Sequence, residues 1–249
     1  MASIEAVTLD LWQTLVVDTR EWGRLRTQIR IDDTVAALQE VGEQVTEEQV
    51  REAFRAGYRE GRSIREQGLE LTFREQVETF VTGISEGIMD RISGETFTHI
   101  LNRYSDAFYD SPPMLPEGIP EMLLSLRTAG YKVGLISNTG MTPGQLFRAY
   151  FKEHGIADFF DYMTFSDEVG MSKPASPIFF HTFASMGCNA ANTVHVGDHK
   201  KNDIAGASEI GMRTVWLQGF DESDVEVNPT AVIENILDLP QALKRLESG

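Results

Sequence analysis

The chain has 249 residues, of which 41% are hydrophobic, and its formal net charge is −16. This length and apolar content predict a substantial core, either in one large domain or in a core with a smaller inserted domain. The acidic balance and the lack of a basic run argue against a nucleic-acid partner, and no apolar run approaches the roughly 20 residues of a membrane span.

The single cysteine, Cys188, excludes an internal disulfide and suits a reducing compartment. The first residues lack a basic stretch, so we expect no signal peptide. We therefore expect a cytoplasmic protein whose partner is a small molecule, and leave a homodimer open. A phosphate ligand would need a local positive site within the negative field, which a metal ion could supply.

The first predicted element is a buried strand from Ile4 to Leu11, a continuous run of apolar and β-branched residues. From about residue 18 to residue 111 helical spacing replaces strand-like runs. Two pairs have the capping-box pattern, Thr46 with Gln49 and Thr72 with Glu75, and mark helix starts. A pair of prolines then ends the last of these helices.

After the prolines, strands and helices alternate. Helices are expected over 119–129, 143–154, 176–186, 202–210 and 239–246, and strands over 132–136, 162–165, 193–196 and 213–217. This alternation predicts an α/β fold with a doubly wound parallel sheet. We predict an α/β core domain from residues 1–17 and 112–249, with an inserted all-helical cap domain over residues 18–111.

Polar side chains follow the predicted strands at the edge where an open parallel sheet carries its chemistry. They are Asp10 with Thr14, Ser137 with Asn138, Lys173, and Asp198 with Asp203. Asp10 can attack phosphorus or carbon, hydroxyls and an amide can hold a phosphoryl oxygen, and Lys173 can neutralise the transferring group. Three converging carboxylates repel one another unless a cation lies between them, and oxygen ligands favour Mg²⁺.

Several of these residues also have a purely structural interpretation. Asp10 can cap the next element, Ser137 and Asn138 can form an ordinary turn, and Asp203 can be a helix N-terminal charge. Lys173 can be a solvated loop residue. A solvated role is the favoured interpretation for three further side chains, namely His199, Lys200 and Lys201.

Four motifs in chain order carry a family resemblance. They are Asp-Leu-Trp-Gln-Thr at 10–14, Leu-Ile-Ser-Asn at 135–138, Ser-Lys-Pro at 172–174 and Gly-Asp-His-Lys-Lys-Asn-Asp at 197–203. In these the chain resembles the haloacid dehalogenase-like hydrolase superfamily, in the form with a helical cap after the first core strand. The resemblance implies a Rossmann-like core and a cap that closes over the site.

The resemblance also implies Mg²⁺, held by Asp10, the backbone carbonyl of Trp12, and Asp198. Asp203 is then an indirect metal ligand or a brace for Lys173. The implied catalytic residues are Asp10, Thr14, Ser137 and Lys173, and the implied substrate-binding residues are Trp12, Ser137, Asn138 and Lys173.

Trp12 departs from the phosphatase pattern. Phosphatases of this superfamily usually carry a second Asp two residues after the nucleophile, where it protonates the leaving oxygen and then activates water. An indole can do neither, and general acid–base help is worth ~10²–10⁴ in rate. We expect Trp12 to narrow the pocket or to stack on the substrate.

Two enzymatic interpretations stay open. A Mg²⁺-dependent phosphatase would take its acid from elsewhere, for example from Asp18, or would act on acyl or aryl phosphates, whose leaving groups need none. A 2-haloacid dehalogenase needs no acid because halide leaves without a proton, and that family resembles this chain in having an aromatic residue at this position. Its tyrosine would correspond to Phe179, and its cap arginine to Arg24, Arg26 or Arg30.

Two further interpretations are disfavoured. A phosphonate hydrolase needs a cap lysine, but the first lysine of the chain is Lys132, after the predicted cap. A catalytically impaired binding protein has no reason to keep four charges together in one cleft. We therefore predict a hydrolase that acts through Asp10, preferably a Mg²⁺-dependent phosphatase of a small phosphorylated metabolite, with the dehalogenase as the alternative.

Overall fold

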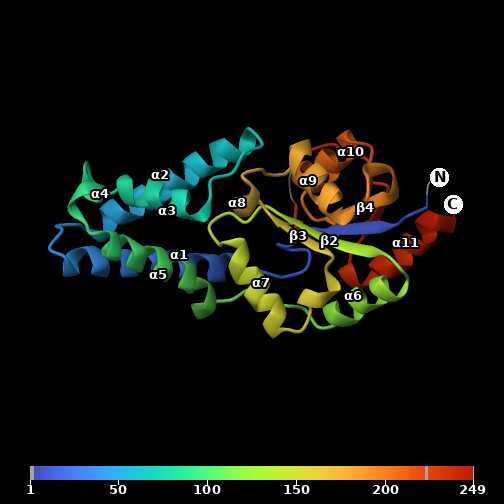
Figure 1. Cartoon of the computed structure of the whole chain (residues 1–249), viewed down its shortest axis with the longest axis horizontal. Helices are drawn as coiled ribbons and strands as arrows, with labels where there is room; N and C mark the ends of the chain where they lie inside the picture. The colour runs from blue at the N-terminus through green and yellow to red at the C-terminus, as the bar shows by residue number, and fades with distance from the viewer. Residues whose placement is uncertain (1–2, 222–223, 249) are drawn as a thin grey trace.

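The computed structural model describes residues 3–221 and 224–248. The expectation about a signal peptide rests partly on residues 1–2, which lie outside the described residues. Figure 1 shows two regions side by side, a group of helices formed by α1–α5 and a second region built around a sheet. Among the described residues no helix has the length and apolar character needed to cross a membrane.

The sheet has six parallel strands in the order β3-β2-β1-β4-β5-β6. Their bounds are Ala6–Leu9 for β1, Lys132–Ser137 for β2, Tyr162–Phe165 for β3, Thr193–Gly197 for β4, Arg213–Leu217 for β5 and Ala231–Ile233 for β6. This confirms the predicted doubly wound α/β fold. Strand β1 lies between β2 and β4, with Leu9 opposite Leu135 on one side and Val196 on the other.

The first strand is shorter than predicted, and the chain turns sharply after Leu11. The amides of Leu15 and Val16 both donate to the carbonyl of Leu11, at 2.9 and 3.0 Å. Gln13 has a φ of 60°, which is uncommon for a residue other than glycine. This tight turn holds Asp10 at the end of the strand instead of extending the strand through it.

Helices cover both faces of the sheet (Figure 1). On one face lie α6 (Ile119–Thr128), α7 (Gly144–Glu153) and α11 (Leu239–Ser248), and on the other lie α9 (Ser176–Met186) and α10 (Gly206–Glu209). A short helix, α8 (Ser166–Val169), follows β3 and was not predicted. Burial on both faces explains why the strands read as continuous apolar runs rather than alternating ones.

The predicted helix over 202–210 is replaced by a π-helical turn at Lys200–Ala205 followed by α10. Gly206 lies against Pro174, since a Cβ at this position would stand 2.8 Å from the proline Cα. The wide turn carries Asp203 inward, where its side chain is 1% exposed. A π-turn at such a position is typical of functional sites.

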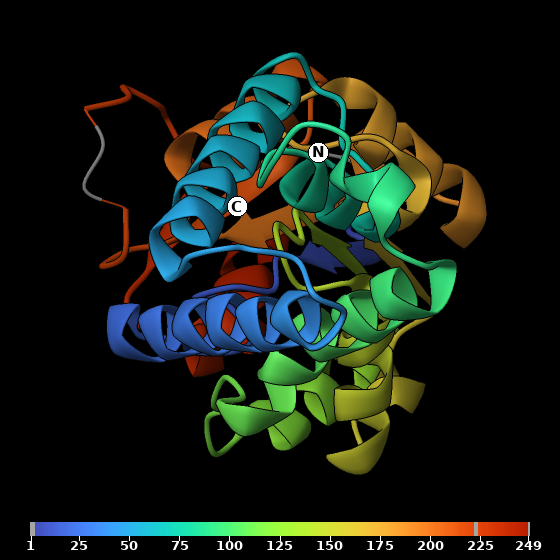
Figure 2. The same ribbon diagram turned by 90° about the vertical axis from the view of Figure 1, so that its left-hand side faces the viewer.

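Five helices lie between β1 and α6, and all of them fall within the predicted cap. They are α1 (Arg20–Glu40), α2 (Glu47–Glu66), α3 (Phe73–Thr82), α4 (Ile88–Arg91) and α5 (Gly94–Asp110). Both predicted capping boxes are present, at the starts of α2 and α3. The helices pack around a hydrophobic cluster of their own, and Figure 2 shows them in front of the sheet. The assignment of residues 18–111 as a separate domain stays a prediction.

The two connections between the helices and the sheet region run side by side. Val17, on the outgoing chain, and Met114, on the returning chain, form an antiparallel bridge. Each amide donates to the other residue's carbonyl at 2.9 Å. The chain therefore leaves the sheet region and re-enters it at neighbouring points.

Candidate active site

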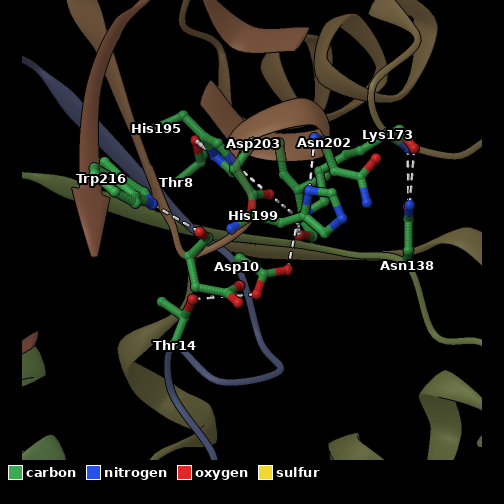
Figure 3. A network of polar contacts seen from close by, with 12 residues as sticks. Thr8, Asp10, Thr14, Asn138, Lys173, His195, His199, Asn202, Asp203 and Trp216 are labelled. Carbon is green, nitrogen blue, oxygen red and sulfur yellow. Dashed lines mark hydrogen bonds and ion pairs between the residues drawn. The ribbon is translucent and has the colours of Figure 1, made fainter. Parts of the chain in front are cut away.

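Asp10 follows the central strand and is 7% exposed. Its Oδ1 accepts a hydrogen bond from Lys173 Nζ at 2.6 Å, and its Oδ2 accepts one from Thr14 Oγ1 at 3.2 Å (Figure 3). Burial raises the pKa of Asp10 to about 6, although the charge of Lys173 opposes this shift. The carboxyl group is therefore mostly ionised at neutral pH, as a nucleophile requires.

Lys173 is 2% exposed and is not a solvated loop residue. Its Nζ donates to Asp10 Oδ1, to Asp203 Oδ1 and to the carbonyl of Ile136, each at 2.6 Å. Burial disfavours the charged amine, but the two carboxylates outweigh it and raise the pKa of Lys173 above its usual value. Lys173 is thus a fixed positive charge beside the candidate nucleophile.

Asn138 holds the backbone of Lys173. Its side-chain amide nitrogen donates to the Lys173 carbonyl, and its side-chain oxygen accepts from the Lys173 amide, each at 2.8 Å. This paired contact ties the loop after β2 to the loop that carries the lysine. The sequence suggested Asn138 as a substrate ligand, and the structure gives its amide a contact with the chain itself.

Asp203 braces Lys173. Its Oδ1 accepts from Lys173 and from His195 Nε2 at 3.2 Å, and its Oδ2 accepts from the His199 amide at 3.0 Å. Burial opposes ionisation, but Lys173 and His195 outweigh it and hold the pKa of Asp203 well below its usual range. Both oxygens already have protein partners, so the geometry favours the brace over direct metal ligation.

His195 and Thr8 complete this network, and the sequence gave no expectation for either. Thr8 and His195 are register partners on β1 and β4, and Thr8 Oγ1 lies 2.9 Å from His195 Nδ1. Burial lowers the pKa of His195 below its usual value, so the ring is neutral. An ionised Asp203 can only accept, so Nε2 carries the ring proton and Nδ1 accepts from the threonine hydroxyl.

Three carboxylates meet at the edge of the sheet. Asp10, Asp198 and Asp203 each offer an oxygen atom within 4.8 Å of the others. Burial, and then the charges of Asp10 and Asp203, raise the pKa of Asp198 to about 8. Three carboxylates that offer oxygen atoms this close together form a donor set that fits a hard divalent ion such as Mg²⁺.

The backbone around Asp198 is fixed by a residue that sequence reasoning did not select. Trp216 on β5 donates from its indole nitrogen to the carbonyl of Asp198 at 2.8 Å (Figure 3).

Ser137, at the end of β2, is buried, and its Oγ has no hydrogen-bond partner within the described part of the chain. An unpaired buried hydroxyl at this edge is free to bind a ligand oxygen.

Trp12 packs against the core through its ring. The indole makes an edge-to-face contact with Phe147 of α7, with the ring centroids 5.0 Å apart, and the residue is partly buried. Its place in the turn after Asp10 is fixed by a bridge to Val16. Stacking of Trp12 on a substrate stays a prediction.

A cleft of about 510 Å³ extends from Lys173 to the helices. The helices contribute Tyr58, Arg62, Arg65 and Glu66, all from α2, and the sheet region contributes Asn138, Gly140, Lys173, Pro174, His199, Lys201, Asn202 and Val225. Basic side chains outnumber acidic ones in this lining, although the whole chain is strongly acidic. His199 and Lys201, for which a solvated role was favoured, are part of it.

The three arginines selected from the sequence do not line this cleft. Arg24 is exposed, Arg26 donates to the carbonyl of Ser111 at 2.6 Å and pairs with Asp18, and Arg30 donates to the carbonyl of Tyr104 at 2.9 Å. Arg62 and Arg65 take their place. Helical spacing did not single out these two because it does not reveal which face of α2 meets the sheet region.

Phe179 is fully buried in a hydrophobic cluster with Ile136, Ile178 and Phe183. Its ring lies edge-on to His195, with centroids 5.3 Å apart. A phenyl ring offers no hydroxyl, and this one is in the core. The position that would hold the dehalogenase tyrosine therefore supplies no polar group to the cleft.

The comparisons with known proteins agree with this architecture. A family model described as haloacid dehalogenase-like hydrolase matches residues 32–217. A glyceraldehyde 3-phosphate phosphatase from Methanothermobacter thermautotrophicus is 35% identical over 127 residues, which are 49% of this chain and 55% of the relative. The chain spans about half the length of the curated relatives that it matches.

Two solved structures share the fold over nearly the whole chain. A 2-haloacid dehalogenase from Pseudomonas syringae pv. Tomato has a TM-score of 0.74 at 23% identity, covering 98% of this chain and 99% of that one. A HAD phosphatase from Thermococcus onnurineus has a TM-score of 0.64 at 20% identity, covering 96% and 98%. These two proteins are named for different reactions, so the fold does not choose between them. The extent of the family match and the shared fold show that the chain belongs to the haloacid dehalogenase-like hydrolase family.

Proposed function

We propose that this protein is a Mg²⁺-dependent phosphatase that hydrolyses small phosphorylated metabolites through Asp10. The observation that carries the proposal is the cluster of Asp10, Asp198 and Asp203 around one point, with Lys173 joining two of them. Asp198 has no role in a metal-free displacement, and a half-buried carboxylate beside two others is costly without a cation. The printed name of the relative from Methanothermobacter thermautotrophicus also supports phosphate-ester hydrolysis.

The chemistry follows from the positions of the side chains. The carboxylate of Asp10 attacks the phosphorus of the substrate, and the bond from phosphorus to the leaving oxygen breaks. Water then attacks the resulting aspartyl-phosphate, which releases phosphate and restores Asp10. Lys173 neutralises charge on the transferring group, Thr14 orients Asp10 by its hydrogen bond, and Ser137 Oγ donates to a phosphoryl oxygen.

The residues that would hold Mg²⁺ are Asp10, Asp198 and the backbone carbonyl of Trp12, with Asp203 acting through Lys173. When bound, the ion supplies positive charge to the phosphoryl oxygens. The chain's own residues fix this donor set, because Trp216 anchors the backbone of Asp198 and the tight turn after Leu11 anchors that of Trp12.

The missing acid narrows the substrate class. Trp12 cannot protonate a leaving oxygen, and Asp18, the substitute suggested by the sequence, is paired with Arg26. We therefore propose substrates with acidic leaving groups, such as acyl or aryl phosphates, as the fastest ones. The basic lining of the cleft, to which α2 contributes Arg62 and Arg65, suits a small anionic metabolite.

The alternative is a 2-haloacid dehalogenase, which the aromatic residue at position 12 favours. Three features oppose it: the buried phenyl ring of Phe179, the engaged guanidinium groups of Arg26 and Arg30, and the retained Asp198. The proposal also includes a cytoplasmic location, which the single cysteine suits, and a cap formed by residues 18–111 that excludes water from the cleft.

The test is phosphate release from p-nitrophenyl phosphate, with Mg²⁺ and with a chelator, using Asp10→Asn as the blank. Nitrophenolate leaves without a proton, so the missing acid does not mask the step that transfers the phosphoryl group to Asp10. We expect release that needs Mg²⁺ and disappears in the variant. If no phosphate is released, and halide is released from 2-chloropropionate without metal, the phosphatase proposal is wrong and the dehalogenase alternative is supported.

A further inference from the structure

The loop between α2 and α3 pairs with the segment that leads to Lys173. In this docking loop (residues 68–70), the Glu70 amide donates to the Gly170 carbonyl at 3.1 Å, and the Gly68 carbonyl accepts from the Ser172 amide at 3.0 Å. An antiparallel bridge joins Leu69 to Met171 between them. The backbone of Lys173 begins directly after this paired stretch.

A side-chain hydrogen bond and a close approach at a glycine hold the docking loop in place. Ser172 Oγ donates to the carbonyl of Leu69 at 2.9 Å. Gly68 has a φ of +78°, and a Cβ at this position would stand 2.5 Å from the Cβ of Ala175. The loop therefore approaches the stretch on both sides of Lys173 more closely than a side chain at residue 68 would permit.

Glu70 extends this contact into the sheet region. Its side chain is 0% exposed, its Oε1 accepts from Arg65 Nη1 at 3.1 Å, and its Oε2 accepts from Ser166 Oγ at 3.1 Å. Ser166 Oγ in turn accepts from the Thr139 amide at 2.9 Å. A buried carboxylate is stabilised only by such partners, so undocking the loop would break a fully satisfied network.

This hydrogen-bond network reaches the backbone of Lys173 by two routes. Thr139 is the residue after Asn138, whose side chain makes the two hydrogen bonds to the Lys173 backbone. The docking loop thus contacts the lysine segment directly, through Ser172, and indirectly, through Ser166, Thr139 and Asn138. Apart from Asn138 and Lys173, no residue on either route is one that we place in contact with substrate or metal.

We propose that Glu70 is a positioning residue, which couples docking of the α2–α3 loop to the orientation of Lys173. The inference rests on the proposed function, because Lys173 acts on a phosphoryl group there. With the loop docked, the lysine points at Asp10. With the loop undocked, the segment 170–173 loses its backbone partners and the lysine loses its alignment, so the site is assembled only when the helices cover it.

The experiment compares Glu70→Ala and Glu70→Gln in the full chain, with Glu60→Ala, an exposed position on the preceding helix α2, as the matched control. With p-nitrophenyl phosphate and Mg²⁺, we expect Glu70→Ala to lower kcat by about 10- to 100-fold, as for a displaced catalytic group. Glu70→Gln retains hydrogen-bonding atoms and should keep most of the rate. Loss of Arg65 alignment would appear instead as a raised KM.

A second variant guards against loss of folding. Ser166→Ala removes the other end of the contact, and combining it with Glu70→Ala should lower kcat no further than either change alone. An additive loss would overturn the coupling. The coupling would also be overturned if the wild-type enzyme is active and the Glu70→Ala variant has the same kcat as the Glu60→Ala control. That result would leave the phosphatase proposal intact.

Amide hydrogen exchange tests the docking of the loop without any measurement of enzyme turnover. The amides of Glu70 and Ser172, which donate across the pairing, should exchange faster in Glu70→Ala than in the control. If the wild-type chain released no phosphate, the phosphatase proposal would fail. Unchanged exchange at these amides would then overturn the docking contact by itself, and faster exchange would support it.

Discussion

Lys173 Nζ lies 2.6 Å from Asp203 Oδ1, and both side chains are 1% exposed. With Asp10 on its other side, the lysine balances two buried carboxylates at once. Removing one partner from a buried ion pair costs more than any exposed pair contributes, because the remaining charge has no compensation. Lys173 is therefore expected to matter for stability as well as for reactivity.

We predict that Lys173→Met lowers the free energy of unfolding by about 3–5 kcal/mol. Urea unfolding monitored by circular dichroism measures this change. The control is Lys201→Met, a cleft residue whose replacement should stay within about 0.5 kcal/mol of wild type. Equal unfolding midpoints for the two variants would contradict the network described for Asp10, Lys173 and Asp203.

Mg²⁺ binding should weaken as the pH falls. Burial and the neighbouring carboxylates raise the pKa of Asp198 to about 8 and burial raises that of Asp10 to about 6, so protons compete with the ion below these values. Between pH 8.5 and pH 6.5 the Kd should rise by at least about tenfold, since one proton is displaced per ion at Asp198. Calorimetry in two buffers of different ionisation enthalpy measures both the affinity and the released proton.

In Asp198→Asn this pH dependence should largely disappear along with most of the affinity. A variant that bound Mg²⁺ as tightly as wild type would remove Asp198 from the metal site. Retained pH dependence down to pH 6.5 in the same variant would assign the competing proton to another group.

Trp12→Asp should create the acid that the chain lacks. If the indole only occupies the place of an acid, the new carboxyl group should speed hydrolysis of an alkyl phosphate. A fully effective general acid–base group raises the rate by ~10²–10⁴-fold. Trp12→Asn is the matched control, because it loses the same contact with Phe147 without gaining an acid. Equal rates for the two variants would mean that the indole has a different role.

Gly68→Ala should destabilise the chain more than Gly42→Ala. Both glycines have a positive φ, +78° and +88°, so both substitutions carry the same backbone strain. Only at Gly68 would the new Cβ meet another atom within 4 Å, the Cβ of Ala175. Thermal unfolding should separate the two variants, and equal Tm values would argue against close docking of the loop.

Much of the site was predictable from the sequence because the carboxyl ends of parallel strands meet at one edge. Asp10 and Ser137 end neighbouring strands, so their motifs converge whatever the details of packing. Lys173 lies in a loop and Asp203 in the π-helical turn, and their contact was one of the two roles that the family resemblance implied for Asp203. The fold class followed in the same way from the alternation of apolar runs with helical spacing.

The residues that were missed depend on contacts between distant segments. His195 reads as one polar residue in a buried strand, and only the register with Thr8 reveals the network. Arg65 lies in a helix and Glu70 in a loop, and their sequence pattern does not reveal that Glu70 binds both Arg65 and Ser166. Strand β6 was missed because a run of three residues is too short to carry a period.

The pairing of Val17 with Met114 makes the helical insert an exchangeable part of the chain. Both ends of the insert leave the sheet region from adjacent points, so a short linker across them would close the remaining chain with little loop-closure entropy. Other segments of unrelated length could be spliced in at the same place without moving a strand. Under the proposed function, the segment between Val17 and Met114 would decide which molecules reach Asp10, while the sheet region holds the reacting groups.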